Sequence, residues 1–504
     1  MVSTSNFYDL IVLGSDLAGL AAAALVARRG KRVLVIPLAP IDGVDTGAPE
    51  PVVAEPAPIV YGESPPIRRV FDELGVWQQV RRERAPIRGR LHLALPDHHL
   101  DLSGGLANLR AELDREWPSA RGIQAWSEHQ RLSSGCHELW EEILASDLAV
   151  SSDGFFDRRA LAKIAAQLPG YDLDDMPPLP AEHPLRVLGR VMLPWLSSLA
   201  PAQLGPAAAL RLAANWDAGP EDFAGGMPRL RGFLLDRLVT HAGEVKPSLR
   251  VAEILVHRGR VSGVAFFGKR DAYGCENMIL ADDPAYLLHD VLPTSGLGGV
   301  FGLSPAEVEP VATRYVLHLD IDASGVSPAL DGIVVHLGET TGWTGRHGIG
   351  TTYLRIDPTV VDDARRLVLT RIIDPRERLE ELRERLLVEL DIAGVLPFVG
   401  PHINWSYSPH DGRGALDRHG REIGERAPDL RPTPMEAIVA RRGAEPVLGV
   451  GIYPHPTELR NLYHASRLNL PGLGLEGELA TALAVAGSIA SPGRSRGRPR
   501  LFGR

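Results

Sequence analysis

The stretch YDLIVLGSDLAGLAAAALVARRGKRVLVI, which runs from residue 8 to 36, decides the fold of this chain. Its residues 10–13 are a short, continuous apolar run, typical of a strand buried on both faces of a parallel sheet. A glycine-containing turn follows, and then an alanine-rich segment that predicts a helix from about 17 to 28, ended by Gly30. Residues 33–36 predict a second buried strand. The stretch therefore predicts a βαβ unit.

The turn between the first strand and the helix carries an altered dinucleotide fingerprint. The pattern G-x-G-x-x-G needs glycine for a tight turn, for close approach of the backbone to a pyrophosphate, and for close helix–strand packing. Gly14 and Gly19 fill the first and third places, but the second is Asp16. Its carboxylate adds bulk and negative charge where the helix N-terminus would hold the pyrophosphate. The alternative interpretation is that Asp16 only caps the helix of an empty nucleotide fold.

The end of the second predicted strand lacks another part of a dinucleotide site. An acidic residue is expected about 20 positions after the first glycine, where it binds a ribose hydroxyl. That position is Pro37, whose side chain has no acceptor. Retained dinucleotide binding and an empty fold therefore both remain open.

Composition limits the class of protein. A chain of 504 residues is too long for one core, so two or more domains are expected. A net charge of −9 gives no support for nucleic-acid binding, and two cysteines supply neither a disulfide framework nor a cysteine metal cluster. The N-terminus lacks the layout of a signal peptide, and no stretch reaches the roughly 18 apolar residues of a membrane span. We expect a cytoplasmic protein, with peripheral membrane contact and oligomeric state left open.

The segments that follow predict a loop, helices and a hairpin. Residues 38–66 are rich in Pro, Gly and Ala and read as a loop. The next helix should stop at Gly75, and alternation around Pro96-Asp97 predicts a hairpin. The histidines at 98–99 lie at the expected turn without further ligands at metal-site spacing, so no metal site is predicted. Residues 107–148 are helical in pattern, with a break at Trp117-Pro118.

Residues 180–216 are the most apolar part of the chain, and prolines divide them into short helices. The prolines are Pro184, Pro194, Pro201 and Pro206. The segment suits the wall of an apolar substrate tunnel or a cap that touches a membrane. It also suits the ordinary core of a second domain, and we slightly favour that interpretation.

The second half of the chain predicts a sheet and two more helices. Residues 312–370 hold several strand candidates, enough for an antiparallel sheet, and 375–390 predict an amphipathic helix with a solvated charged face. Residues 405–434 read as a long irregular loop. A strand at 447–453, a glycine-rich turn and a small-residue helix follow, and the tail beyond Ser491, with five arginines, reads as disordered.

Four segments, in this order, resemble one family. They are the opening stretch, LALPDHHLDLSGGLANLRAELDREWP at 93–118, GGMPRLRGFLLDRLVTHAGEVKPSLRVAEILVHRGRVSGVAF at 225–266, and LYHASRLNLPGLGLEGELATALAVAG at 462–487. Together they resemble the FAD-dependent amine oxidase, protoporphyrinogen oxidase and phytoene desaturase superfamily, most of all its carotenoid desaturase-like branch. The resemblance implies a mixed α/β fold with a discontinuous, Rossmann-like FAD/NAD(P)-binding domain. An inserted substrate domain of antiparallel sheet and helices is implied with it.

The resemblance also implies domain boundaries. The FAD/NAD(P)-binding domain would comprise residues 1–105, 221–300 and 441–491. The substrate domain would comprise a helical part, 106–220, and a sheet part, 301–440, with 492–504 as a disordered basic tail.

Cofactor-binding residues follow from the same resemblance. The turn residues Gly14, Ser15, Asp16 and Gly19 would lie near the pyrophosphate, and Val251 would meet the adenine through its backbone. Gly225 and Gly226 would approach the flavin or the substrate. The residues along the ribityl chain and isoalloxazine would be Pro471, Gly472, Gly474 and Gly477. Glycine suits such places because a side chain would obstruct the cofactor, although glycine also simply permits turns.

Departures from the family pattern lie mainly on the ADP half of the implied site. Besides Asp16 and Pro37, the family's Gly-Gly-Arg segment after the second strand is replaced by the Pro/Ala-rich residues 38–58. Glu476 sits at a turn–helix junction beside the implied ring site. It would either cap the helix that follows or place negative charge near the cofactor.

The leading hypothesis is a flavin-dependent oxidoreductase that moves a hydride from an apolar small-molecule substrate to FAD. No catalytic acid or base is identifiable by spacing. The alternative is a cofactor-less binding protein on the same fold, for which GDP-dissociation-inhibitor relatives of the superfamily set a precedent. A third hypothesis, an NAD(P)-dependent reductase, is weaker because Pro37 lacks the ribose-binding acid.

Overall fold

The predicted βαβ unit is present with the predicted bounds in a computed structural model of the chain. Strand β1 (Phe7–Gly14) leads into helix α1 (Leu17–Arg28) and strand β2 (Val33–Ile36). The two strands pair in parallel. Every residue of α1 up to Ala27 is buried, and Gly30 beyond its end has a φ of +81°. The small side chains of α1 thus let other helices approach on all sides.

The structure describes most of the chain, with gaps. The described residues are 6–38, 58–59, 63–86, 90–102, 105–118, 122, 124–127, 137, 140–145, 159, 163, 183–217, 221–223, 226–247, 249–268, 272–288, 300–301, 303–327, 330, 332–338, 347–423 and 432–490. The predicted basic tail, most of the Pro/Ala-rich loop and Gly225 lie outside these residues.

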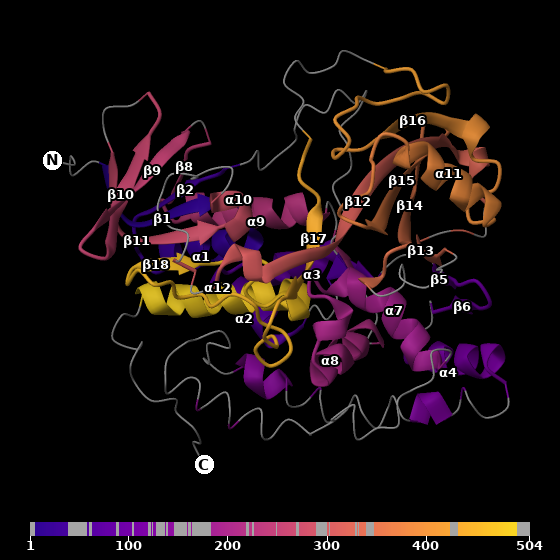
Figure 1. The fold of residues 1–504 in the computed structure, drawn as a ribbon, viewed down its shortest axis with the longest axis horizontal. Helices are drawn as coiled ribbons and strands as arrows, with labels where there is room; N and C mark the ends of the chain where they lie inside the picture. The colour runs from indigo at the N-terminus through magenta and orange to yellow at the C-terminus, as the bar shows by residue number, and fades with distance from the viewer. Residues whose placement is uncertain are drawn as a thin grey trace.

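Strand β1 lies inside a seven-stranded sheet that joins three distant parts of the chain (Figure 1). The order is β8-β2-β1-β11-β10-β9, and β18 pairs in parallel with β11 beside β10. The added strands are β8 (Glu244–Val245), β9 (Val251–His257), β10 (Arg260–Phe266), β11 (Tyr273–Ala281) and β18 (Leu462–His464). Strands β8, β2, β1, β11 and β18 are all parallel neighbours, so their carboxyl ends share one edge of the sheet.

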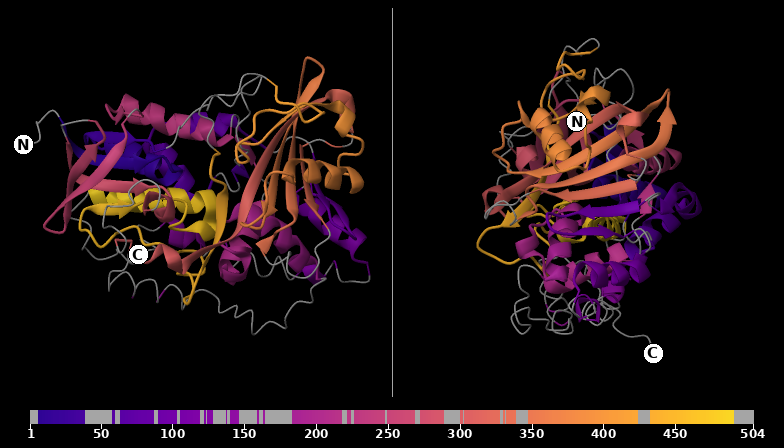
Figure 2. Two further views of the ribbon diagram at one scale, coloured as in Figure 1. Left: turned by 45° about the horizontal axis from the view of Figure 1, so that its top comes forward. Right: turned by 90° about the vertical axis from the view of Figure 1, so that its right-hand side faces the viewer.

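Three helices pack together on this sheet. Helix α1 lies against α12 (Gly474–Ala490) and α9 (Gly226–Thr240), so the first and last helices are neighbours (Figure 2). Their buried side chains form one apolar cluster with one face of the sheet. The segment Pro471–Ala490 is long and apolar enough to cross a membrane, yet half of it is buried inside the protein, as expected of a core helix.

The predicted antiparallel sheet is confirmed as an eight-stranded sheet of order β16-β12-β15-β14-β13-β5-β6, with β17 beside β12. Its strands are β5 (Arg90–Ala94), β6 (His99–Asp101), β12 (Val308–Asp322), β13 (Gly332–Leu337), β14 (Thr351–Val361), β15 (Ala364–Ile373), β16 (Ile403–Tyr407) and β17 (Glu436–Arg441). The predicted hairpin β5–β6 belongs to this sheet, because β5 pairs in parallel with β13. The sequence analysis placed these residues in the first domain, and their strands pair with the second sheet.

Further elements surround the two sheets. They are α2 (Pro65–Glu73), α3 (Trp77–Glu83), α4 (Gly105–Glu116), the short α10 (Pro284–Tyr286), α11 (Leu382–Ile392) and a small sheet of β3 (Pro58–Ile59), β7 (Glu221–Phe223) and β4 (Arg84–Pro86). Helix α2 stops just before Gly75, as predicted, with Leu74 as its C-cap. Helix α4 ends at the predicted break.

Three local predictions were wrong for identifiable reasons. The helix predicted from Pro375 begins only at Leu382, since the Asp374 carboxylate binds the amide of Arg376 and forms a turn. The strand predicted at 447–453 is a tight turn in which Val447 and Gly451 bond each other. The predicted loop at 405–434 begins within strand β16.

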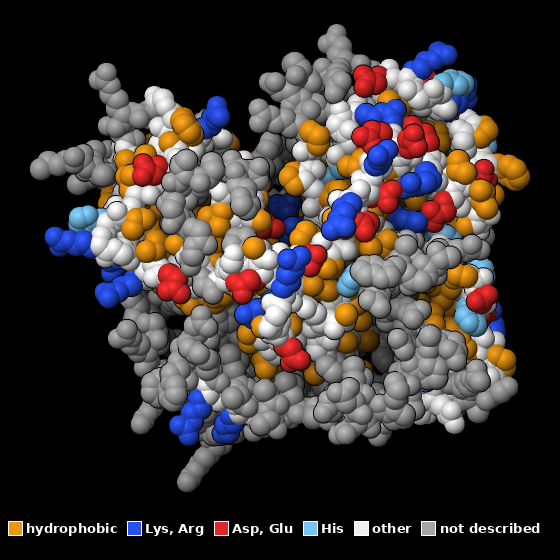
Figure 3. All heavy atoms as spheres, in the orientation of Figure 1, with side chains coloured by type: hydrophobic (Ala, Val, Ile, Leu, Met, Phe, Trp, Pro, Cys, Tyr) orange, Lys and Arg blue, Asp and Glu red, His pale blue; other side chains and the backbone are white. Residues whose placement is uncertain are grey.

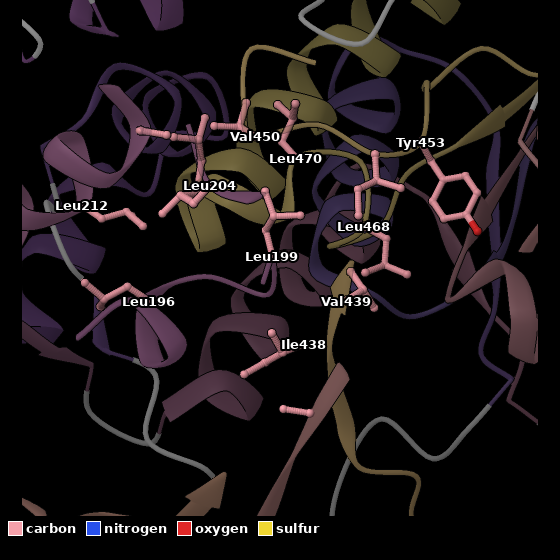
Figure 4. Close-up of a cluster of buried hydrophobic side chains, with 14 of the residues drawn as sticks. Leu196, Leu199, Leu204, Leu212, Ile438, Val439, Val450, Tyr453, Leu468 and Leu470 are labelled. Carbon is pink, nitrogen blue, oxygen red and sulfur yellow. The ribbon is translucent and has the colours of Figure 1, made fainter. Parts of the chain in front are cut away.

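The apolar residues 180–216 contain α7 (Pro184–Leu196), a short 3-10 turn (Pro201–Gln203) and most of α8 (Pro206–Asp217). Pro194 lies inside α7 and does not end it, and its carbonyl accepts a hydrogen bond from Arg314. Leucines of this segment pack on side chains of β17 and the C-terminal part of the chain (Figure 4). The residues labelled there are Leu196, Leu199, Leu204, Leu212, Ile438, Val439, Val450, Tyr453, Leu468 and Leu470. This packing is that of an apolar core.

Candidate functional site at the carboxyl edge of the parallel sheet

The turn between β1 and α1 is shaped by close packing of the chain on itself. Gly14 has a φ of +109°, and a Cβ there would collide with the carbonyl oxygen of Ala281. A Cβ on Gly19 would collide with the side chain of Ala281. Both glycines are therefore explained by helix–strand packing, the third role in the fingerprint.

Asp16 occupies the N-cap position of α1 without capping it. Its amide donates to the Ala281 carbonyl at 3.0 Å, and its side chain makes no capping hydrogen bond. The carboxylate Oδ2 instead accepts from the backbone N–H of Arg467 at 3.3 Å. The sequence-based interpretation of Asp16 as a side-chain cap is thus wrong, because the carboxylate turns towards the end of the chain.

The N-terminus of α1 consequently keeps its amide donors open. The first hydrogen bond of the helix is that of Leu20 N–H to Asp16 O. Within the part of the chain that the structure describes, no acceptor is recorded for the amides of Leu17, Ala18 and Gly19. Unpaired amides at a helix N-terminus favour an anion.

The segment after β18 is held rigidly beside this turn. The amide of Ala465 donates to Leu280 O at 3.0 Å, which continues the strand pairing past His464. The buried side chain of Asn469 accepts from the Ser466 amide and donates to Tyr453 O. The predicted approach of the two ends of the chain is therefore present, and Arg467 is the residue that meets Asp16.

The glycines of the C-terminal motif also fit against protein. A Cβ on Gly472 would come within 2.6 Å of Val450 Cα. Gly474 has a φ of +54° and faces the Leu196 carbonyl, and a Cβ on Gly477 would meet the Leu470 carbonyl. Pro471 is buried, and its own carbonyl accepts from the Ser198 amide. Packing of α12 against α7 and its own leading turn explains these positions.

Glu476 takes a role that neither sequence-based alternative foresaw. Its carboxylate pairs with Arg211 on α8 at 2.8 Å, and both side chains are buried. Arg211 also contacts Glu141 at 2.6 Å and His137 at 2.9 Å. Glu476 therefore neither caps α12 nor lies as a free charge beside a ring site, because its charge is paired inside the protein.

Two further residues implied by the resemblance lie elsewhere in the fold. Val251 is buried at the start of the edge strand β9, opposite Phe266. Gly226 is the first residue of α9 and has a φ of +60°. No contact of either residue with the β1–α1 turn is recorded among the described residues. Ser15 is half-buried within that turn.

Charged side chains gather at the same edge, and sequence reasoning missed most of them. Asp16 follows β1, Asp282 follows β11 and Arg467 follows β18. Ligands of parallel α/β sheets bind outside the carboxyl ends of the strands. Listing the polar residues that follow each predicted strand would therefore have found Asp282 and Arg467.

An ion-pair chain continues from this edge to the second sheet. Arg467 Nη1 lies 3.2 Å from Glu436 Oε1 on β17. Glu436 Oε2 lies 3.2 Å from Arg314 Nη1 on β12. Arg314 Nη2 donates to the carbonyls of Pro194 and Ser197, both at 2.8 Å. The chain of contacts therefore connects the end of β18 with α7.

Glu436 and Arg467 are only partly buried. The Glu436 side chain keeps 43% of its surface accessible and the Arg467 side chain keeps 21%. Desolvation by the surrounding protein is nevertheless the largest influence on the pKa of both residues. Figure 3 shows a recess between the two halves of the molecule with basic and acidic side chains at its floor.

Burial and neighbouring negative charges raise the pKa values of three carboxyl groups at this edge of the sheet. Burial raises the pKa of Asp16. Burial together with the charge of Asp16 raises the pKa of Asp282 to about 7. Burial, Asp16 and Glu436 raise the pKa of Glu478 to about 8. The carboxyl groups of Asp282 and Glu478 therefore change protonation near neutral pH.

Arginines lower the pKa of Glu436, in contrast to the raised pKa values of the other carboxyl groups. Burial alone would raise the pKa of Glu436, but Arg467, Arg314 and Arg231 together lower it. Arg231, on α9, also lowers the pKa of Asp16. Three arginines and four carboxyl groups thus share the recess.

Comparison with known proteins places the fold. No family model and no curated protein sequence matches this chain. Cyclohexylamine oxidase from Brevibacterium oxydans IH-35A matches it with a TM-score of 0.54 and 14% identity, over 96% of this chain and 99% of that one. A putrescine oxidase double mutant, redesigned in cofactor binding, matches it with a TM-score of 0.52 and 14% identity, over 96% of this chain and 99% of that one. This chain has the fold of these amine oxidases.

The superfamily fold is shared beyond these two oxidases. Rab GDI from Plasmodium falciparum matches with a TM-score of 0.52 and 10% identity, over 96% of this chain and 98% of that one. At these identities the likeness is one of fold. The predicted fold class is confirmed, and the fold is the one that the family resemblance implied.

The recess can be tested against FAD, the cofactor that this amine oxidase fold implies. The open amides of α1 form a donor set suited to a diphosphate, and arginines lie beside it. Asp16 and Asp282 oppose an anion, but the pKa of Asp282 is raised to about 7, so protonation near neutral pH removes its charge. Pro37, buried at the end of β2, offers no ribose contact. The diphosphate end of the site therefore fits FAD, and its ribose end lacks the usual acid.

Proposed function

We propose that this chain is an FAD-dependent oxidoreductase that oxidises an apolar small molecule. The observation that carries the proposal is the N-terminus of α1 at the carboxyl edge of the parallel sheet, where the amides of Leu17, Ala18 and Gly19 have no acceptor among the described residues and would suit an anion. The amine oxidase fold over almost the whole chain supports it. Bound FAD would supply the hydride acceptor, and the protein would supply position and a dry environment.

The residues at this edge would divide that work. The amides of α1 would hold the diphosphate, and the carboxyl groups of Asp16 and Asp282 would hold or release protons beside it. The ion pair between Glu436 and Arg314 would keep α7 close to the recess. Leucines of α7 and its neighbours would exclude water on the apolar side. We assign no acid or base for the chemical step.

The visible spectrum of the purified full-length protein tests the proposal. Oxidised-flavin absorbance, either on purification or after incubation with FAD at pH 6, is the expected result. Absence of both, with quenching of FAD fluorescence also absent, would contradict it.

A cofactor-free binding protein is the second candidate, and Asp16, Asp282 and Pro37 favour it because each departs from what a bound dinucleotide needs. The double variant Asp16→Gly with Pro37→Glu separates the two candidates. If only the double variant binds FAD, the parent is the cofactor-free protein. Tight binding of FAD by the parent removes this candidate.

A further inference from the structure

Arg231 on α9 is a cation without a partner among the described residues. Its Nε is buried and makes no hydrogen bond to any described residue. No carboxylate among the described residues lies within ion-pair distance of it, although its charge acts on Asp16, Glu436 and Glu478. A buried guanidinium nitrogen without an acceptor is unfavourable, and an anion held at the nearby amides of α1 would supply that acceptor.

The position of α9 directs this cation to the candidate site. Helix α9 packs beside α1, the helix whose first amides are open. Arg231 follows the start of α9 by only five positions, and its field reaches Asp16 at the start of α1. The unpaired guanidinium and the unpaired amides therefore surround the same place.

Arg467 is a second cation at this place, and it can change partners. Its backbone N–H is bonded to Asp16, which fixes its Cα beside the β1–α1 turn. Its guanidinium lies 3.2 Å from Glu436. Glu436 is also paired with Arg314, so that carboxylate keeps a partner if Arg467 turns away. Exchanging one half-exposed ion pair for another costs little.

We propose that Arg231 and Arg467 bind the diphosphate of FAD at the N-terminus of α1. This inference rests on the proposed function and names the residues that compensate for Asp16. The two diphosphate charges would meet two guanidinium groups, whose planar donor sets suit phosphate oxygens. One cation comes from the middle of the chain and the other from its end, which is why a search of the N-terminal fingerprint alone does not find them.

Equilibrium binding to the full-length protein tests the inference with three probes: FAD, ADP and riboflavin. FAD and ADP carry the diphosphate, and riboflavin lacks it. Arg231→Met and Arg467→Met should each weaken binding of FAD and ADP by about tenfold or more, since a charge-assisted hydrogen bond is lost. Riboflavin binding should stay unchanged. Fluorescence quenching serves for the flavins and calorimetry for ADP.

Arg237→Met is the matched control. Arg237 lies on the same helix and its Nε also lacks an acceptor among the described residues, but its charge acts on His241. The control should bind all three probes like the parent. A thermal unfolding curve for each variant checks that α9 and the C-terminal segment remain folded.

The outcomes separate this inference from the proposed function. A parent protein that binds neither FAD nor ADP contradicts the proposed function. A parent that binds both, with unchanged binding in Arg231→Met and Arg467→Met, overturns the inference and leaves the function standing. Equal losses for riboflavin and ADP would also overturn it, because the arginines would then support the fold and not the diphosphate.

Discussion

The backbone N–H of Arg467 donates to the carboxylate of Asp16 at 3.3 Å, across 451 positions of sequence. This contact connects the first turn of the chain with the loop after β18, its last strand. Its acceptor stands where a dinucleotide fingerprint has glycine, and its donor residue carries a guanidinium beside that position. The same edge of the sheet therefore bears both the charge that opposes an anionic cofactor and the charges that favour it.

Removing the Asp16 carboxylate should strengthen FAD binding. Asp16→Asn keeps the size of the side chain and removes its charge, and Asp16→Gly removes both. Because like charges at this separation in a partly buried site repel by on the order of 1 kcal/mol or more, affinity should rise about tenfold in either variant. Fluorescence titration at one fixed pH measures it. Unchanged affinity in Asp16→Asn would show that the carboxylate does not face the cofactor.

Affinity for FAD should fall as the pH rises from 6 to 8. The pKa of Asp282 is raised to about 7, and binding of a diphosphate favours the protonated form. Loss of one linked proton lowers affinity by up to about tenfold per pH unit. Asp282→Asn should flatten this dependence. A parent protein whose affinity is independent of pH would rule out proton uptake by this residue.

The same carboxyl group should make stability depend on pH. The pKa of Asp282 is higher in the folded state than in an unfolded chain, so its contribution to stability is present at low pH and is lost as the pH rises through about 7. Relative to the parent, Asp282→Asn should therefore gain stability between pH 6 and 8. Melting temperatures across this range measure the effect. A constant difference between the two proteins would contradict it.

Glu476→Ala should destabilise the protein strongly. It leaves the fully buried Arg211 without its closest buried carboxylate, while Glu141 remains as a partner. Breaking a buried pair on one side costs about 3 kcal/mol. Glu476→Gln, which still accepts a hydrogen bond, should lose less. Urea unfolding compares the variants, and a midpoint for Glu476→Ala equal to that of the parent would be inconsistent with a structural ion pair.

Gly474→Ala and Gly487→Ala should act in opposite directions within one helix. Gly474 has a φ of +54° and faces the Leu196 carbonyl, so a Cβ there is strained and obstructed, at a cost of about 2 kcal/mol. A Cβ on Gly487 meets nothing within 4 Å, so alanine there should stabilise α12 by about 0.5–1 kcal/mol. Denaturant midpoints of the two variants test this. Similar midpoints for both would contradict the packing of α12 against α7.

Part of the candidate site was open to prediction because it is local. Residues 10–36 carry the periodicity and helix-ending signals of a βαβ unit, and the bounds of α1 and β2 agree with the prediction. Asp16 and Pro37 stand at fixed offsets within that unit, so their departure from the fingerprint was readable without a structure. The turn that holds the glycines at 472, 474 and 477 was readable from the sequence, whereas the protein atoms packed against each of them were not.

The charged recess was not open to prediction by motif. Arg231, Glu436 and Arg467 lie on separate elements, and no local spacing relates them. Likewise, nothing near Glu476 indicates that Arg211, 265 positions earlier, neutralises it. The pairing of the β5–β6 hairpin with β13 was likewise not readable from local pattern, because it depends on which sheet edge is free.

The amino-acid sequence by itself determined the βαβ unit, the antiparallel strands, the small-residue helix at the end and the altered fingerprint, because hydrophobic periodicity, turn residues and helix ends act over a few positions. Only the tertiary structure decided that the Asp16 carboxylate leaves the helix end open, that Glu476 is paired, and that Arg231 has no partner in the part of the chain that the structure describes. Those properties depend on distances between residues hundreds of positions apart, and the electrostatic energy of a charge depends on which neighbours surround it.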